Sequence, residues 1–342
     1  MGSALSARDD ARAVPPVVIL TGATSGIGRA TAIAFARQGY RIGLIARGED
    51  GLHATLADVQ RSGGEGLILQ ADVSNAQELE AAAATAAGRW GSIDVWVNNA
   101  MVTVFSDVSR LGADELRRVT EVTYLGAVWG TMAALKHMKR RGRGVIVQVG
   151  SALAYRSIPL QAAYCGAKSA LRGFTDSLRS ELIHQGSAIH VTMVHLPAVN
   201  TPQFDVARSR LPGRPRPLGT IYQPEIAAHA IVWASQHRRR ELWVGLSTEQ
   251  AILGTRIAPG LLDRILARLG FDGQQSALPP APQNNLFNAL PGDRGAHGRF
   301  DAEAASRSPH LWAATHPKTY YAAIALAALC TVRAFTRRRR AT

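Results

Sequence analysis

The sequence predicts an α/β fold, a doubly wound parallel sheet of about seven strands with helices on both faces. Short, fully apolar segments such as Val17–Leu20 are typical of strands that are buried on both faces of a sheet. They alternate with longer segments of helical period, which predicts right-handed strand–helix–strand crossovers. A glycine-rich turn at residues 21–28 joins the first strand to the first helix. In such folds ligands bind at the carboxyl ends of the strands.

Each expected element follows from a local pattern. The strands are apolar runs at residues 17–20, 41–46, 66–70, 95–97, 145–149, 189–195 and 242–244. The helices carry apolar residues three or four positions apart and are expected at residues 29–38, 52–61, 76–89, 113–139, 164–184 and 261–269. Gly39 and the pair Gly63-Gly64 end the first two helices. The alternation predicts one domain over residues 17–250.

The segments outside this alternation have other compositions. Residues 1–16 are polar and charged, which predicts a flexible arm and no secretory signal. Residues 251–318 are expected to be a helix followed by a Pro/Gly-rich extension. Residues 319–342 are apolar and then Arg-rich, and the apolar part is shorter than the roughly 20 residues that a membrane span needs. A packed or soluble terminal helix is expected there, and membrane contact through this tail is the alternative.

Charge and cysteine content narrow the class of partner. The net charge of +14 comes partly from local arginine runs, which are expected to be solvated; an anionic membrane surface or acidic partners are the alternatives. No basic stripe with interleaved aromatic residues and no zinc-finger spacing is present, so we predict neither nucleic-acid binding nor a metal site. The two cysteines, Cys165 and Cys330, form no disulfide framework, which favours a reducing, cytoplasmic compartment.

Tyr164 and Lys168 lie one helical turn apart and are expected on the same helix face. An ammonium near a phenol favours the phenolate, so we expect the pKa of Tyr164 to fall from about 10. Tyr164 is therefore a candidate general acid or base. The spacing alone is common in exposed helices, and the prediction depends on the glycine-rich turn and on Ser151, thirteen residues before Tyr164.

The glycine-rich turn predicts a nucleotide site. Gly22, Gly26 and Gly28 allow a tight turn whose backbone N–H groups approach a pyrophosphate at a helix N-terminus. After the second strand, an acid would bind the ribose hydroxyls of NAD, whereas an arginine suits the 2′-phosphate of NADP. Arg47 stands there, so NADP(H) is favoured over NAD(H); a solvated role for Arg47 and the nearby acid Glu49 leave NAD open.

In this order, Thr21–Gly28, Asn98–Ala100, Ser151 and the Tyr164/Lys168 pair resemble the short-chain dehydrogenase/reductase family over about residues 16–250. The resemblance implies a Rossmann-type fold and an NAD(P)-dependent oxidoreductase that interconverts a carbonyl and an alcohol by hydride transfer. It also implies a small-molecule substrate and, because members are often dimeric or tetrameric, a homo-oligomer.

The resemblance assigns roles to individual positions. Tyr164 would protonate the carbonyl oxygen or deprotonate the alcohol, Lys168 would lower the Tyr164 pKa and bind the nicotinamide ribose, and Ser151 would orient the substrate oxygen. Asp72 would bind the adenine, with a helix N-cap as its alternative. The cofactor-binding positions implied are Thr21, Gly22, Thr24, Ser25, Gly26, Ile27, Gly28, Asp72, Val73, Asn98, Asn99, Ala100, Pro197, Val199 and Thr201, together with Tyr164 and Lys168.

Three positions depart from the family pattern. Thr123 stands where the family has a fourth catalytic residue, an asparagine. A threonine can hydrogen-bond a water there, and it can bend the helix through a bond to its own helix backbone. Met101 and Ala198 replace glycines near the cofactor. Two alternatives to an ordinary reductase stay open: an NADP(H)-binding regulatory or scaffold protein with weak turnover, and a membrane-surface reductase of a lipid-like substrate.

Overall fold

The computed structural model describes residues 14–320. Its centre is a seven-stranded, fully parallel sheet with the order β11-β7-β6-β4-β1-β2-β3, which confirms the predicted fold class. The strands are β1 (Val17–Thr21), β2 (Arg41–Ala46), β3 (Glu65–Gln70), β4 (Val95–Asn98), β6 (Arg143–Ser151), β7 (Ala188–Leu196) and β11 (Glu241–Trp243). Most of the expected N-terminal arm and nearly all of the apolar tail lie outside the described residues.

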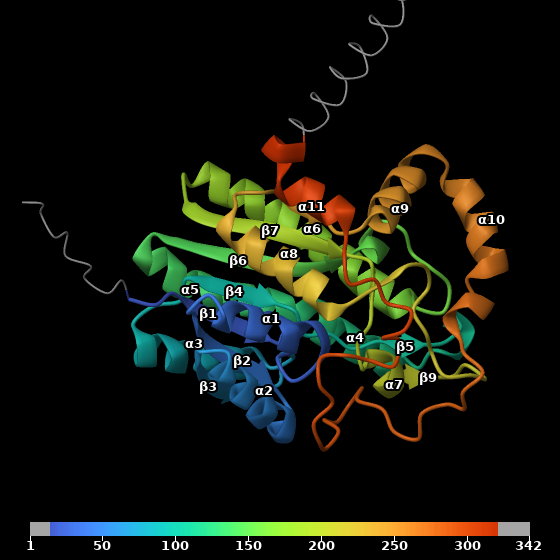
Figure 1. The fold of residues 1–342 in the computed structure, drawn as a ribbon, viewed down its shortest axis with the longest axis horizontal. Helices are drawn as coiled ribbons and strands as arrows, with labels where there is room; N and C mark the ends of the chain where they lie inside the picture. The colour runs from blue at the N-terminus through green and yellow to red at the C-terminus, as the bar shows by residue number, and fades with distance from the viewer. Residues whose placement is uncertain (1–13, 321–342) are drawn as a thin grey trace, which may run out of the picture.

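Helices cover both faces of this sheet (Figure 1). One face packs on α1 (Gly26–Ala36), α2 (Glu49–Arg61) and α8 (Pro224–Gln236). The other packs on α3 (Ala76–Trp90), α5 (Gly126–Arg141) and α6 (Ala162–His184). Neighbouring residues of β1 are divided between the two cores, because successive strand side chains point to opposite faces.

The helix predicted over residues 113–139 is interrupted. It consists of α4 (Ala113–Thr120), a π-helical turn at Glu121–Leu125, and α5. Thr123 lies in this turn, but its hydroxyl does not bond to its own helix. It donates to the Val102 carbonyl oxygen at 3.0 Å and accepts from the Val102 N–H at 3.1 Å. A π-helical turn interrupts the helix, and the expected intrahelical bond is replaced by bonds to the loop after β4.

Shorter elements surround the carboxyl edge of the sheet. Two small parallel sheets pair β8 (Ala198–Val199) with β10 (Ile221–Tyr222), and β5 (Val104–Phe105) with β9 (Arg208–Ser209). The remaining helices are α7 (Gln203–Val206), α9 (Leu246–Ile257), α10 (Pro259–Leu269) and α11 (Pro309–Thr315), and short 3₁₀ turns occur at 108–110, 152–154 and 272–274. Across residues 14–320, no helix combines the length and apolar character needed to cross a membrane.

The extension after α10 returns to the domain. Its long irregular segment buries Leu286 completely in the core of the α3/α5/α6 face. Phe300 is 3% exposed and packs in a separate cluster with Phe105 and Phe204. In Figure 1 this segment runs past α2 and α7, at the carboxyl edge of the sheet.

Candidate functional site

The glycine-rich turn connects β1 to α1 in a conformation that requires glycine. Gly22 and Gly26 have φ values of +68° and +56°, where side chains are disfavoured. A Cβ on Gly28 would lie 2.0 Å from the Gly22 carbonyl oxygen. Within the described residues, the N–H groups of Ile27 and Gly28 at the start of α1 have no hydrogen-bond acceptor. The turn therefore presents two free donors at the positive end of a helix.

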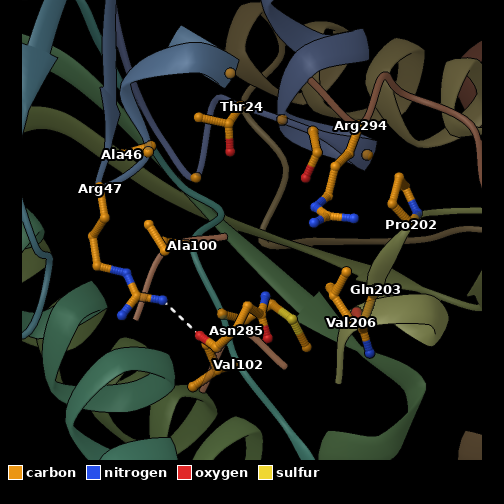
Figure 2. A pocket seen from close by; sticks show the side chains of 18 of the residues that line it. Thr24, Ala46, Arg47, Ala100, Val102, Pro202, Gln203, Val206, Asn285 and Arg294 are labelled. Carbon is orange, nitrogen blue, oxygen red and sulfur yellow. Dashed lines mark hydrogen bonds between the residues drawn. The ribbon is translucent and has the colours of Figure 1, made fainter. Parts of the chain in front are cut away.

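A cavity of about 210 Å³ lies against this turn (Figure 2). Its walls come from the ends of β1, β2, β3 and β4, from the loop leading into α7, and from residues 285–294 of the extension. Of the predicted cofactor residues, it is lined by Gly22, Thr24, Ser25, Gly26, Ile27, Gly28, Arg47, Asp72, Val73, Asn99, Ala100 and Thr201. Pro197 and Val199 do not line it; Val199 is 6% exposed and pairs with Tyr222 between β8 and β10.

Two of the predicted residues shape the turn. The Thr21 hydroxyl accepts hydrogen bonds from the N–H groups of Asn99 and Ala100, at 2.9 and 3.1 Å. The Asn99 side-chain amide donates to the carbonyl oxygens of Thr21 and Gly22, at 3.0 and 3.2 Å. These bonds tie the end of β1 to the loop after β4 and fix the floor of the cavity.

The Asn98 side chain does not line this cavity, although the family resemblance places Asn98 among the cofactor-binding positions. It is 3% exposed, accepts from Trp96 Nε1 at 2.8 Å, and donates to Thr131 and Gln148 at 3.0 Å each. Successive side chains of a strand alternate between faces, so Asn98 enters the core while its neighbour Asn99 reaches the turn.

Asp72 and Arg47 lie on one side of the cavity. Arg118 donates to Asp72 Oδ2 at 2.5 Å, and an Arg47 guanidinium nitrogen lies 3.9 Å from the same oxygen. Burial alone would raise the pKa of Asp72, but hydrogen bonds from Arg118 and Ser74 outweigh it and hold the pKa below its usual value. The N-cap alternative for Asp72 is wrong, because the Asn75 side chain caps α3.

Ser151, Tyr164 and Lys168 converge where β6 meets α6. Ser151 ends β6 and is 7% exposed, and its side chain lies near enough to the Tyr164 phenol to lower the pKa of that phenol. The Lys168 ammonium lies 5.7 Å from the centre of the Tyr164 ring and donates to the Val149 carbonyl oxygen at 2.7 Å.

The predicted fall in the Tyr164 pKa is wrong for this arrangement. Burial raises the pKa of the phenol above its usual value, and the interaction with the nearby Ser151 side chain only partly offsets the rise. Burial also lowers the pKa of Lys168 to about 8. The ammonium is directed to the carbonyl of Val149, so it does not pair with the phenol oxygen. Desolvation therefore decides the direction of the pKa shift of both Tyr164 and Lys168.

Two features of the site were not predicted. Beneath Ser151, buried His195 donates from Nδ1 to the Ser151 carbonyl oxygen at 3.1 Å, and its Nε2 lies 3.5 Å from Glu241. The Tyr155 hydroxyl donates to the same carboxylate at 2.7 Å. The available signal was a histidine, His195, near the end of the mostly apolar strand β7. The second feature is the wall formed by residues 285–294, for which the irregular sequence gave no signal.

Comparison with known proteins adds an independent line of evidence. Residues 16–211 match the short chain dehydrogenase family. The chain is 32% identical to the uncharacterized oxidoreductase YxnA of Bacillus subtilis, over 82% of this chain and 81% of that protein. It is 30% identical to the putative oxidoreductase SadH of Mycobacterium tuberculosis, over 73% and 94%, and 32% identical to a 3-oxoacyl-[acyl-carrier-protein] reductase of Synechocystis, over 51% and 71%. With the glycine-rich turn on a seven-stranded parallel sheet, these matches show that the chain belongs to the short-chain dehydrogenase family, whose members are oxidoreductases that use a nicotinamide cofactor.

Proposed function

We propose that this protein is an NADP(H)-dependent reductase that interconverts a carbonyl and an alcohol, with Ser151, Tyr164 and Lys168 as its reacting group. The observation that carries the proposal is the convergence of three groups at the carboxyl edge of the sheet: Ser151 at the end of β6, and the Tyr164 phenol and Lys168 ammonium on α6. In a parallel α/β sheet this edge is where ligands bind.

The residues around the cavity fit a nicotinamide dinucleotide. The glycine-rich turn has no room for a Cβ at Gly28, so the backbone there is open to close approach by a ligand. The free N–H groups of Ile27 and Gly28 suit a pyrophosphate. The carboxylate of Asp72 and the backbone of Val73 offer polar partners for an adenine. Arg47 offers a cation for a 2′-phosphate, since its bonds to Asn285 and Phe287 use two of its five N–H donors.

The bound nicotinamide supplies or accepts a hydride. Tyr164, whose pKa is raised, stays protonated at neutral pH and can give its proton to a carbonyl oxygen. Ser151 orients that oxygen through its hydroxyl. Lys168, with a pKa of about 8, is mostly protonated at pH 7 and favours the phenolate that remains. Thr123 has no part in this proposal, because its hydroxyl donates to the Val102 carbonyl oxygen and accepts from the Val102 N–H.

The decisive experiment is NADPH oxidation by the wild type and by Tyr164→Phe with a panel of ketones, aldehydes and 3-oxoacyl thioesters. The thioesters are included because one relative is named a 3-oxoacyl-[acyl-carrier-protein] reductase and another a ketoacyl reductase. We expect turnover to fall about 100- to 10,000-fold while NADPH still binds. The matched control is Tyr40→Phe. Tyr40 lies directly before β2 and does not line the cavity, so loss of its hydroxyl should leave full activity. Equal turnover in wild type and Tyr164→Phe would refute the role of Tyr164.

The preference for NADP(H) is tested at Arg47. We expect Arg47→Ala to weaken NADPH binding about tenfold or more, and NADH binding clearly less, because only NADPH carries the 2′-phosphate. Arg37→Ala, which removes an exposed arginine at the end of α1, is the control. An equal loss for both cofactors would refute the 2′-phosphate assignment.

A second candidate function, reduction of a lipid-like substrate at a membrane surface, is favoured by α10. This helix exposes Leu261, Ile265 and Leu269 to 58%, 40% and 63%. Arg264 and Arg268 are exposed on the same helix, the pairing of apolar and basic side chains that anionic lipid surfaces bind. The Arg156–Asp263 ion pair joins α10 to the loop after Ser151.

Cosedimentation with anionic and neutral phospholipid vesicles tests this candidate. The double variant Leu261→Asp/Leu269→Asp should lose binding to anionic vesicles, and Leu116→Asp, at an exposed leucine of α4, should retain it. Failure of the wild type to bind anionic vesicles would exclude the candidate and leave the first proposal intact.

A further inference from the structure

Residues 285–295 form a strap across the outer side of the dinucleotide cavity. One end is anchored by Leu286, which is fully buried, and by the hydrogen bond from Asn285 N–H to the Val206 carbonyl oxygen at 2.9 Å. The other end is anchored at the glycine-rich turn, where the Gly26 N–H donates to the Gly295 carbonyl oxygen at 3.1 Å. The strap therefore begins beside α7 and ends at the N-terminus of α1.

Between its ends the strap is fastened to α1 and α2. The Gly292 N–H donates to Asp50 Oδ2 at 2.7 Å, and Asp293 forms an ion pair with Arg29. The strap carboxylate is thus paired with Arg29, which also binds Asp58, and is not left to face the cavity. These contacts fix the backbone on both sides of Arg294.

Arg294 is the strap residue that the fold leaves unpaired. It is half-buried, it lines the cavity, and within residues 14–320 its guanidinium has no hydrogen-bond or ion-pair partner. Figure 2 shows its side chain extending into the cavity between Thr24 and Pro202, on the opposite side from Arg47. Partial burial of a guanidinium without a hydrogen-bond or ion-pair partner costs free energy, because the group loses water and gains nothing in exchange. The placement of Arg294 therefore indicates an anionic ligand.

The groups near Arg294 identify which part of a ligand it meets. Its neighbour Gly295 is bonded to Gly26, the first residue of α1, so Arg294 stands at the glycine-rich turn. The free N–H groups of Ile27 and Gly28 belong to the same turn and face the same cavity. Two amides at a helix N-terminus and one guanidinium form a donor set for a phosphate group.

We infer that Arg294 binds the pyrophosphate of the nicotinamide dinucleotide, and that the strap closes the cavity over it. The inference rests on the proposed function, because it needs a dinucleotide in this cavity. A planar guanidinium can bind phosphate oxygens through two parallel N–H donors, and Arg294 would do so beside the free N–H groups of the glycine-rich turn. The extension thereby supplies a cofactor residue from outside the alternating strand–helix region.

The test is titration of intrinsic fluorescence with NADPH and with NADH, on the wild type, Arg294→Ala and Arg294→Lys. We expect Arg294→Ala to raise the Kd of both cofactors by about 10- to 100-fold, because both carry the pyrophosphate. Arg294→Lys should recover part of the affinity, since an ammonium keeps the charge without the paired donors. The control is Arg307→Ala, which removes an exposed arginine of the same extension outside the cavity.

The outcomes separate this inference from the proposed function. A wild type that binds neither cofactor overturns both. A wild type that binds, with an unchanged Kd in Arg294→Ala, overturns only the inference. A loss confined to NADPH would place Arg294 on the 2′-phosphate and would also overturn the pyrophosphate assignment. Thermal unfolding of each variant confirms that it is folded, as expected for a side chain without protein partners.

Discussion

The Arg47 guanidinium donates a 2.7 Å hydrogen bond to the carbonyl oxygen of Asn285, a residue 238 positions later in the chain. A second bond of 2.7 Å joins it to the carbonyl oxygen of Phe287. The arginine after β2, which we propose binds the 2′-phosphate, is therefore also an anchor of the strap. The proposed selection of NADP(H) and the proposed closure of the cavity both depend on this side chain.

Arg47→Ala should loosen the strap even without cofactor. Both carbonyl oxygens lose a charge-assisted partner, so amide hydrogens of residues 285–295 should exchange several-fold faster. Hydrogen–deuterium exchange by mass spectrometry measures this, with Arg37→Ala as the control. Unchanged exchange in this segment would mean that Leu286 and the Gly26–Gly295 bond hold the strap alone.

Lys168 should give the protein a stability that rises with pH between 8 and 10. Its pKa is about 8 in the folded protein and 10.5 when exposed, so between these values the unfolded chain binds the extra proton. The cost of burying the ammonium is fully present below pH 8 and disappears as pH rises toward 10.5. A shift of this size corresponds to roughly 3 kcal/mol at most.

Urea denaturation of the wild type and of Lys168→Met at pH 7, 8, 9 and 10 measures this effect. The wild type should gain stability relative to the variant as pH rises. The range stops at pH 10 because, above it, the raised pKa of Tyr164 acts in the opposite direction. A difference that does not change with pH would show that Lys168 is not desolvated.

The Thr123 hydroxyl should matter for stability. Thr123→Val keeps the shape but leaves the N–H and carbonyl groups of Val102 unpaired in a buried site, at a cost of about 1 to 3 kcal/mol. Thr123→Ser keeps both bonds and should lose much less. Denaturant titration of both variants measures the free energy of unfolding. Similar losses of stability in the two variants would show that the cost comes from altered packing and not from the lost hydrogen bonds. Thr123→Asn should not raise turnover, because residue 123 bonds the Val102 backbone. A large gain in turnover would instead support the alternative of a protein whose turnover is weak because the family asparagine is missing.

The neighbours Asn98 and Asn99 should respond differently to alanine. Asn98→Ala removes the oxygen that accepts from Trp96 Nε1 and the amide that donates to the Thr131 hydroxyl in the core. This change should cost about 2 kcal/mol of stability or more. Asn99→Ala removes bonds that hold Thr21 and Gly22, so it should weaken NADPH binding. Thermal unfolding and fluorescence titration of both variants test this split. Equal effects of the two changes on cofactor binding would contradict it.

Local patterns determined the sheet and the main site. Apolar runs, helical spacing and glycine stops depend on neighbours in the chain, and they gave each strand of the central sheet to within a few residues. The glycine-rich turn and the pair Tyr164/Lys168 were equally visible, because spacing along one turn or one helix fixes which groups share a side. The extension lacks such periodicity, and its path depends on contacts with residues more than 200 positions away.

The sequence by itself determined the fold class, the family and the candidate reacting group, Ser151, Tyr164 and Lys168. Only the tertiary structure decided the environment of these groups. Burial raises the pKa of Tyr164 where the sequence predicted a fall, because desolvation depends on everything packed around the phenol. The placement of the strap and of the unpaired Arg294 guanidinium was likewise decided by tertiary structure. The extension folds back over a cavity that exists only after β1, β2 and α1 have assembled.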